Sequence, residues 1–175
     1  PAEFMAGNMS RCINDITKIT KLMSECQAMG IPCLGPDVNE SQRKFSANKK
    51  GEVRFGLSAI KGMGDAAAVN IIAEREKNGP YKDIFDFIQR VNLSSVNRKA
   101  LESLALSGGF DSFGIKREQY FAQNVKGDTF IETILRYGQV YQTEQSSMQN
   151  SLFGDMGGIE ITTPPVPNCE PWSTM

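Results

Sequence analysis

The feature that most constrains this sequence is a glycine-x-glycine turn between two segments whose apolar residues recur at helical spacing. Residues 57–61 predict one helical turn and residues 65–77 a longer helix, with Gly62 and Gly64 between them. Glycines at these positions allow positive φ and let another molecule approach the backbone closely. The N–H groups that open the second helix lack intrahelical acceptors and lie at the positive end of its dipole. The turn therefore predicts a phosphate site.

Side chains on both sides of the turn fit this prediction. Ala68 is small enough to let the two helices cross closely, and five apolar residues would fix them together: Leu57, Ile60, Met63, Ile71 and Ile72. The pattern resembles the helix-hairpin-helix motif, which binds the DNA backbone in many polymerases, ligases and repair enzymes. Asp65 would repel a phosphate at the helix start, so we expect the anion nearer the amides of Gly62 and Gly64. A purely structural helical turn is the alternative.

Charge is distributed unevenly along the chain. Residues 41–127 carry 15 basic and 9 acidic side chains, whereas residues 1–40 carry 3 and 5, and residues 128–175 carry 1 and 6. A locally basic region suits an anionic partner even though the whole chain has a net charge of −1. The predicted contacts to duplex DNA, made to phosphates without sequence preference, are Lys49, Lys50, Arg54, Lys61, Gly62, Met63 and Gly64.

The sequence gives no sign of a catalytic centre. Histidine is absent, which removes the commonest general base and the commonest metal ligand. Asp83 and Asp86 are close in sequence, but Asp83 is expected to cap a helix, and a two-metal site needs converging carboxylates. We predict no catalytic residue, metal or cofactor here. Four cysteines without a C-x-x-C pair fit reduced thiols in the cytoplasm, and no apolar run is long enough to span a membrane.

The remaining pattern predicts a mainly α fold. An amphipathic helix is expected over residues 10–29 with Ser10 as its N-cap, and a small β-hairpin from residues 43–47 and 52–57. After residue 142 the chain turns polar and then proline-rich, so we expect no packed core there. Further helices are predicted over residues 83–91, 97–107 and 116–125, and from a cap at Asp128 to Tyr141.

Residues 95–123 predict a second, degenerate hairpin in which the glycine-x-glycine spacing is lost. Packing against the first hairpin and direct contact with DNA both stay open for this copy. The predicted fold class is a tandem helix-hairpin-helix domain with a small β-hairpin, followed by a flexible C-terminal segment.

The whole chain resembles the alpha subunit of bacterial DNA polymerase III. The resemblance implies that residues 1–35 end a fingers domain, residues 36–127 form the tandem hairpin domain, and residues 128–175 form a helix and a linker. It also implies a parent DNA polymerase that uses Mg²⁺, with its catalytic aspartates upstream, and both chain ends are expected to be cuts in a longer protein. The matching segments are residues 1–6, 36–41, 54–57, 60–64, 79–81, 108–112 and 170–173.

A second functional segment follows from this resemblance. Gln149, Ser151, Leu152 and Phe153 resemble the family's sliding-clamp-binding pentapeptide, presented as an extended segment. The implied function is to hold duplex DNA and the clamp during replication, which adds processivity, with other replicase subunits as partners of the parent protein. The alternatives are a hairpin module of a repair protein or ligase, a structural helical interaction domain, and, for the pentapeptide, packing of Leu152 and Phe153 on the helices.

Overall fold

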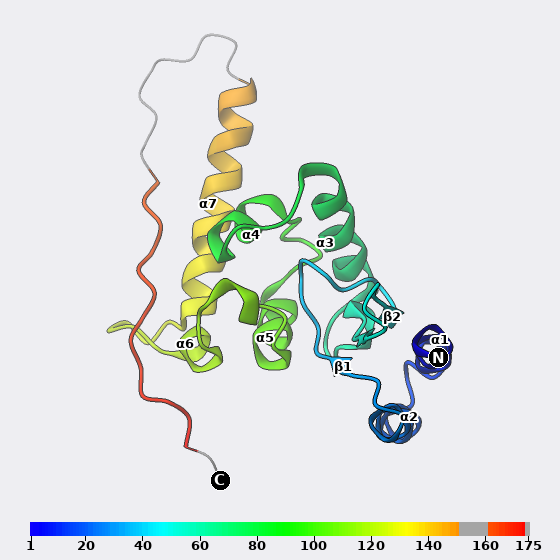
Figure 1. The fold of residues 1–175 in the computed structure, drawn as a ribbon. Helices are drawn as coiled ribbons and strands as arrows, with labels where there is room; N and C mark the ends of the chain where they lie inside the picture. The colour runs from blue at the N-terminus through cyan, green and yellow to red at the C-terminus, as the bar shows by residue number, and fades with distance from the viewer. Residues whose placement is uncertain (151–160, 174–175) are drawn as a thin grey trace.

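The computed structural model describes residues 1–150 and 161–173, and in these ranges the chain is mainly helical with a three-stranded sheet (Figure 1). The predicted fold class is confirmed. In chain order the elements are α1 (Ala2–Arg11), α2 (Ile16–Ala28), β1 (Cys33–Leu34), β2 (Ser46–Ala47), β3 (Val53–Arg54), the 3-10 turn η1 (Leu57–Ala59), α3 (Asp65–Asn78), α4 (Ile84–Arg90), α5 (Arg98–Ser107), the 3-10 turn η2 (Asp111–Phe113), α6 (Arg117–Phe121) and α7 (Phe130–Asn150).

The helix expected over residues 10–29 with Ser10 as its N-cap is wrong. The chain breaks between α1 and α2, and Asp15 caps α2 by accepting from the N–H of Lys18 at 3.1 Å. Ser10 instead lies inside α1, and its hydroxyl donates to the carbonyl oxygen of Phe45 at 3.2 Å. The apolar period runs unbroken through the turn, so spacing alone could not locate the break.

The β-hairpin is confirmed, but its strands are shorter than expected and a third strand, β1, joins the sheet. β2 pairs antiparallel with β3, and β1 pairs with the other side of β3 in parallel, with Cys33 opposite Val53. Strands this short need a neighbour to be stable. They receive it from α1 and α2, whose buried side chains share a small core with Phe45 and Val53.

A larger core lies among the later helices. α7 packs against α4, α5 and α6 (Figure 1). The predicted N-cap of α4 is confirmed, because the carboxylate of Asp83 accepts from the N–H of Asp86 at 2.7 Å. Asn97 caps α5 in the same way. α6 ends at Phe121, four residues earlier than the sequence predicts.

The predicted cap of α7 at Asp128 is also wrong. Thr129 occupies that role: its Oγ1 accepts from the N–H of Glu132 at 3.3 Å, and the Glu132 carboxylate accepts from the N–H of Thr129 at 2.8 Å. Asp128 pairs with Arg136 instead. The helix then continues past Tyr141 to Asn150.

The last side chain that anchors α7 to the helical core by hydrogen bonds is Gln142. Its Nε2 donates to three carbonyl oxygens at the end of α4, those of Ile88, Gln89 and Val91, at 2.8–3.2 Å. From Thr143 onward the described side chains of α7 are mostly exposed. They are polar and compatible with a helix, so the helix persists without a core to bury it.

Residues 161–173 lie beside α6 and the start of α7 in an extended conformation (Figure 1). Ile161 packs against the main core, and the ring of Trp172 lies 5.9 Å from that of Phe121. The amide of Gln119 donates to the carbonyl oxygen of Pro167 at 2.8 Å. These residues thus contact the helical body at single points, and none of them is buried, so they form no packed core of their own.

A buried cation connects the loop before the hairpin to α3. Arg75 is 8% exposed, and its Nη1 donates to the carbonyl oxygens of Val38 and Ser41, each at 2.9 Å. Ser41 is fully buried, and its hydroxyl donates to the carbonyl oxygen of Phe55 at 2.7 Å. Phe55 packs against both cores, so this junction joins the two halves of the chain. The implied domain boundaries stay a prediction.

We predict that Arg75→Ala lowers the free energy of unfolding by about 2–4 kcal/mol, because two buried carbonyl groups lose a charged donor. Arg136→Ala is the matched control: its ion pair with Asp128 is exposed, and its loss should cost less than about 1 kcal/mol. Urea unfolding followed by circular dichroism measures both. Equal losses in the two variants would contradict the role given to Arg75.

Candidate nucleic-acid interface

The glycine turn joins η1 to α3. Gly62 has φ of +89°, whereas Gly64 is extended at φ −74° and is the N-cap of α3. The sequence allows positive φ at both glycines, and the structure uses it at Gly62 only. A Cβ at Gly64 would meet nothing within 4 Å, so its space is open. Gly62 is thus required by the backbone, and Gly64 keeps the entrance to the helix clear.

The predicted apolar wedge is confirmed. Of its five members Ile72 is half-buried against the core, and the others are buried, as is the small Ala68. Met63 is itself only 8% exposed, which leaves its backbone rather than its side chain for a ligand. The buried apolar side chains therefore fix the two helical segments to the core, and the backbone of the turn is left at the surface.

The opening of α3 presents backbone donors at the surface. The bond from the N–H of Ala68 to the carbonyl oxygen of Gly64, at 3.2 Å, is the first bond of the helix. The N–H groups of Asp65 and Ala66 precede it and belong to exposed residues. Together with the helix dipole, they make this end of α3 electropositive.

Asp65 does not leave an uncompensated negative charge beside the turn. Its carboxylate accepts from Nε and Nη2 of Arg43 at 2.7 and 2.6 Å, and from the Ser58 hydroxyl at 2.8 Å. The hydrogen bonds from Arg43 and then from Ser58 hold the pKa of Asp65 below its ordinary value. The carboxylate therefore stays ionised, but the guanidinium offsets its charge and the repulsion expected from sequence is reduced.

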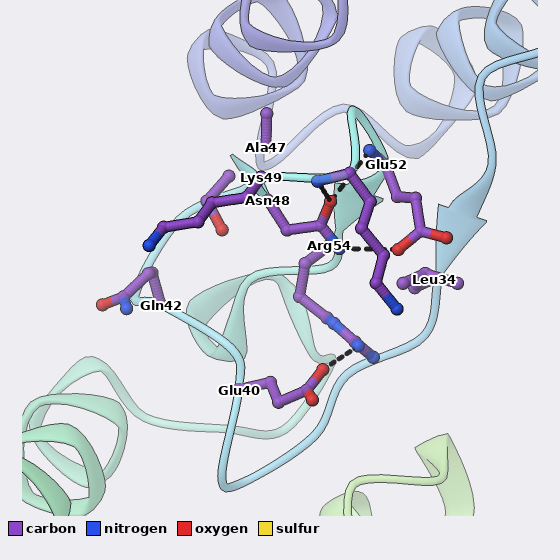
Figure 2. Close-up of a pocket in the computed structure, with 10 residues that line it drawn as sticks. Leu34, Glu40, Gln42, Ala47, Asn48, Lys49, Glu52 and Arg54 are labelled. Atoms are coloured by element: carbon purple, nitrogen blue, oxygen red, sulfur yellow. Dashed lines mark hydrogen bonds and ion pairs between the residues drawn. The ribbon is translucent and has the colours of Figure 1, made fainter.

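The predicted DNA-binding residues fall into two groups in space. Lys61, Gly62, Met63 and Gly64 lie at the turn, and Lys61 is exposed. Lys49, Lys50 and Arg54 instead line an open pocket of about 740 Å³ on the hairpin (Figure 2).

The pocket is not confined to the strands. Gln42, the neighbour of Arg43, also lines it, and the carbonyl oxygen of Gln42 accepts from the N–H of Leu57 at the start of η1, at 2.9 Å. That both groups of residues contact DNA stays a prediction.

Arg54 is already engaged inside the protein. Its side chain is 17% exposed, donates to the carbonyl oxygen of Gly35 at 3.0 Å, and forms an ion pair with Glu40 (Figure 2). These contacts fix the hairpin to the loop that precedes it. A role for Arg54 in binding DNA stays a prediction, as do the roles of Lys49 and Lys50.

Sequence reasoning missed two side chains that lie against the turn. A Cβ placed on Gly62 would be 2.6 Å from Oγ of Ser103 and 3.5 Å from Cε of Lys99, both on α5. The two residues are four apart and share one face of that helix. The spacing shows that they lie together, but only the tertiary fold shows that they face Gly62.

The second hairpin is tied into the interior. Gly108 ends α5 with a left-handed φ of +89°, and Phe110, which follows it closely, is buried in the main core. The carbonyl oxygen of Gly109 accepts from the N–H of Val38 at 3.1 Å, and Arg117 pairs with Asp111. These contacts support the packing interpretation for residues 108–117.

The clamp-binding prediction lies mostly outside the described residues. Ser151, Leu152 and Phe153 belong to residues 151–160, which the structure does not describe. Gln149 is described, and it is exposed near the end of α7. The expected extended conformation is therefore wrong at Gln149.

Two further observations concern only residues 1–150 and 161–173. No helix there is long and apolar enough to cross a membrane. No group of three or more histidine, cysteine, aspartate or glutamate side chains there could hold a metal ion. That this part of the chain is not catalytic stays a prediction.

Known proteins with similar sequences point to one family. Residues 30–120, more than half of the chain, match the family model described as a helix-hairpin-helix motif. The DNA polymerase III subunit alpha of Haemophilus influenzae is 35% identical over 172 residues, which are 94% of this chain and 14% of that protein. The subunit of Pasteurella multocida is 44% identical over 154 residues, 88% of this chain and 13% of the relative. The subunit of Chlamydia trachomatis is 45% identical over 113 residues, which are 65% of this chain and 9% of that protein. The chain thus spans at most about one seventh of the length of these relatives.

We predict different costs for alanine at the two glycines of the turn. Gly62→Ala should lower the free energy of unfolding by about 2–3 kcal/mol, because the residue has positive φ and its Cβ would displace Ser103. Gly64→Ala should cost less than about 1 kcal/mol, since its backbone is extended and its space is open. Thermal or urea unfolding measures both, and a larger loss at Gly64 would refute this account of the turn.

Proposed function

This chain belongs to the bacterial DNA polymerase III alpha subunit family through its helix-hairpin-helix region, and we propose on that premise that it binds the phosphate backbone of duplex DNA. The proposal includes the setting that the resemblance implies: a replicative, Mg²⁺-dependent DNA polymerase of the cytoplasm. The chain contributes DNA binding to that protein rather than its catalytic carboxylates.

One observation carries the proposal: the turn exposes Lys61 and Gly64 beside the electropositive start of α3. Gly64 leaves its entrance open, and the N–H groups that open α3 belong to exposed residues. Asp65, the acidic residue that follows the turn, is paired with Arg43. An oxyanion at this place meets backbone donors, the helix dipole and the Lys61 ammonium together.

The same chemistry explains why binding should ignore sequence. Backbone amides and lysine side chains contact phosphate oxygens, which are alike at every base pair. Most of the binding free energy then comes from the release of counterions, so the affinity falls steeply as salt is added.

The two alternatives have less support. A hairpin module of a repair protein or a ligase would share the turn, but the relatives reported above are named as DNA polymerase III alpha subunits. A purely structural turn would explain the buried apolar wedge but not the excess of basic side chains over residues 41–127, which favours an anionic partner. Duplex DNA is therefore the partner that we propose.

We also propose that residues 149–153 bind the bacterial sliding clamp, which would increase the processivity of the parent polymerase. The support is the sequence Gln-Asn-Ser-Leu-Phe, which offers one amide and two large apolar side chains. Gln149 is exposed, so its amide is accessible to a partner. Because DNA threads the clamp, the two attachments would raise each other's effective concentration.

We predict that this chain binds unrelated duplexes equally well. The affinity should fall steeply between about 50 and 200 mM salt, because phosphate contacts release counterions. Lys61→Ala should lower the slope of log K against log salt by about 1, if Lys61 neutralises one phosphate. Lys77→Ala is the control, since Lys77 is exposed at the other end of α3, roughly 20 Å from the turn.

Fluorescence anisotropy with labelled duplexes at several salt concentrations measures these slopes. Gly64→Ala should also weaken binding although it keeps the fold, because its Cβ stands where the phosphate approaches. A strong sequence preference, or binding that is indifferent to salt, would rule out the proposed backbone interface.

For the clamp, we predict that a peptide spanning residues 148–155 binds a bacterial sliding clamp weakly and that joint replacement of Leu152 and Phe153 by alanine abolishes binding. Each side chain is worth roughly 1.5–3 kcal/mol when fully buried, which is most of what so short a peptide can gain. Asp155→Asn, outside the pentapeptide, is the control. Calorimetry measures the affinities, and unchanged binding by the double variant would leave these residues without a role in clamp binding.

A further inference from the structure

A face of α5 stands directly against the glycine turn. The position of a Cβ on Gly62 would be 2.6 Å from Oγ of Ser103, and Cε of Lys99 lies 3.5 Å from the same point. Both residues project from one side of α5, four positions apart. The turn therefore has a second wall, formed by a helix that begins more than thirty residues later in the chain.

The charges on α5 are not equally available. Arg98 is bound to Glu102 at 2.8 Å and to Glu132 at 2.6 Å, so both neighbouring carboxylates already have a cation. Lys99 is exposed, and among the described residues no carboxylate pairs with it or with Lys61. Two lysine side chains beside one turn, neither paired with a described carboxylate, make a local positive potential that attracts an anion.

Ser103 adds a hydroxyl to the same wall. It is half-buried, and its Oγ makes no hydrogen bond to another described residue, so its proton is free for a ligand. Its closeness to Gly62 gives that glycine a second function besides positive φ. Any side chain at residue 62 would force the hydroxyl away from the turn.

We propose that α5 completes the DNA-backbone site, with Lys99 as a phosphate ligand opposite Lys61 and the Ser103 hydroxyl as a neutral donor between them. The proposal rests on the proposed function, because the anion is a phosphodiester of the duplex held at the turn. α5 is the first helix of the second hairpin, the one predicted over residues 95–123. The site therefore draws its ligands from both halves of the tandem hairpin domain, although residues 108–117 themselves pack inward.

The test is a double-mutant series on the full chain, with labelled duplex DNA as the probe and salt titrations as the readout. Lys99→Ala and Lys61→Ala should each lower the slope of log K against log salt by about 1, and the double variant by about 2. Lys99→Arg should keep the slope, because the charge is retained. Lys77→Ala should also leave it unchanged. Lys99 is exposed, so the thermal unfolding of Lys99→Ala should match that of the unmodified chain.

The outcomes separate this inference from the function on which it rests. If Lys61→Ala lowers the slope and Lys99→Ala changes neither the slope nor the affinity, α5 has no part in the site and only the inference falls. If the unmodified chain binds duplexes without dependence on salt, both fall. If Lys99→Arg lowers the slope as much as Lys99→Ala, the effect does not come from charge and the inference is likewise overturned.

Discussion

The guanidinium of Arg75 is buried and has no carboxylate partner in the part of the chain that the structure describes, and burial lowers its pKa because the charged form loses water. What keeps it in place is a pair of carbonyl oxygens, from Val38 and Ser41, in the loop that precedes the hairpin. The contact fixes that loop against α3. The Ser41 hydroxyl also donates to the carbonyl oxygen of Phe55, which fixes the second arm of the hairpin to the same loop. Because α3 is a rigid rod, anchoring it near Arg75 also sets where its opposite end, the glycine turn, faces solvent.

The site at that end is electrostatic in character and assembled from distant parts of the chain. The hairpin arm supplies Arg43, which compensates Asp65, while α3 supplies backbone donors and α5 supplies Lys99. None of these groups is buried deeply, so each separate attraction is modest and is screened by salt. These groups act together, because several weak attractions reach one anion without any movement of the fold.

Local signals in the sequence were sufficient for part of this picture. Gly62 and Asp83 act through neighbours a few residues away, and the sequence predicts both correctly. The predicted N-caps at Ser10 and Asp128 are wrong because another polar residue accepts from the helix N–H groups instead. That residue is Asp15 in the first case and Thr129 in the second. Strand β1 and the side chains on α5 depend on contacts between segments far apart in sequence, which no local pattern records. The grouping of Lys49 with Lys61 rests on charge alone and stays a prediction.

Helix α7 outlasts the core that supports it. Gln142 is its last firm attachment to the helical core, where one amide binds three carbonyl oxygens at the end of α4. Eight further residues continue the helix to Asn150, an overhang of roughly 12 Å. A helix resists bending over this length, whereas an irregular segment of the same composition would sample many conformations. Residues 143–149 therefore extend away from the helical body, in a direction that is set by the hydrogen bonds of Gln142.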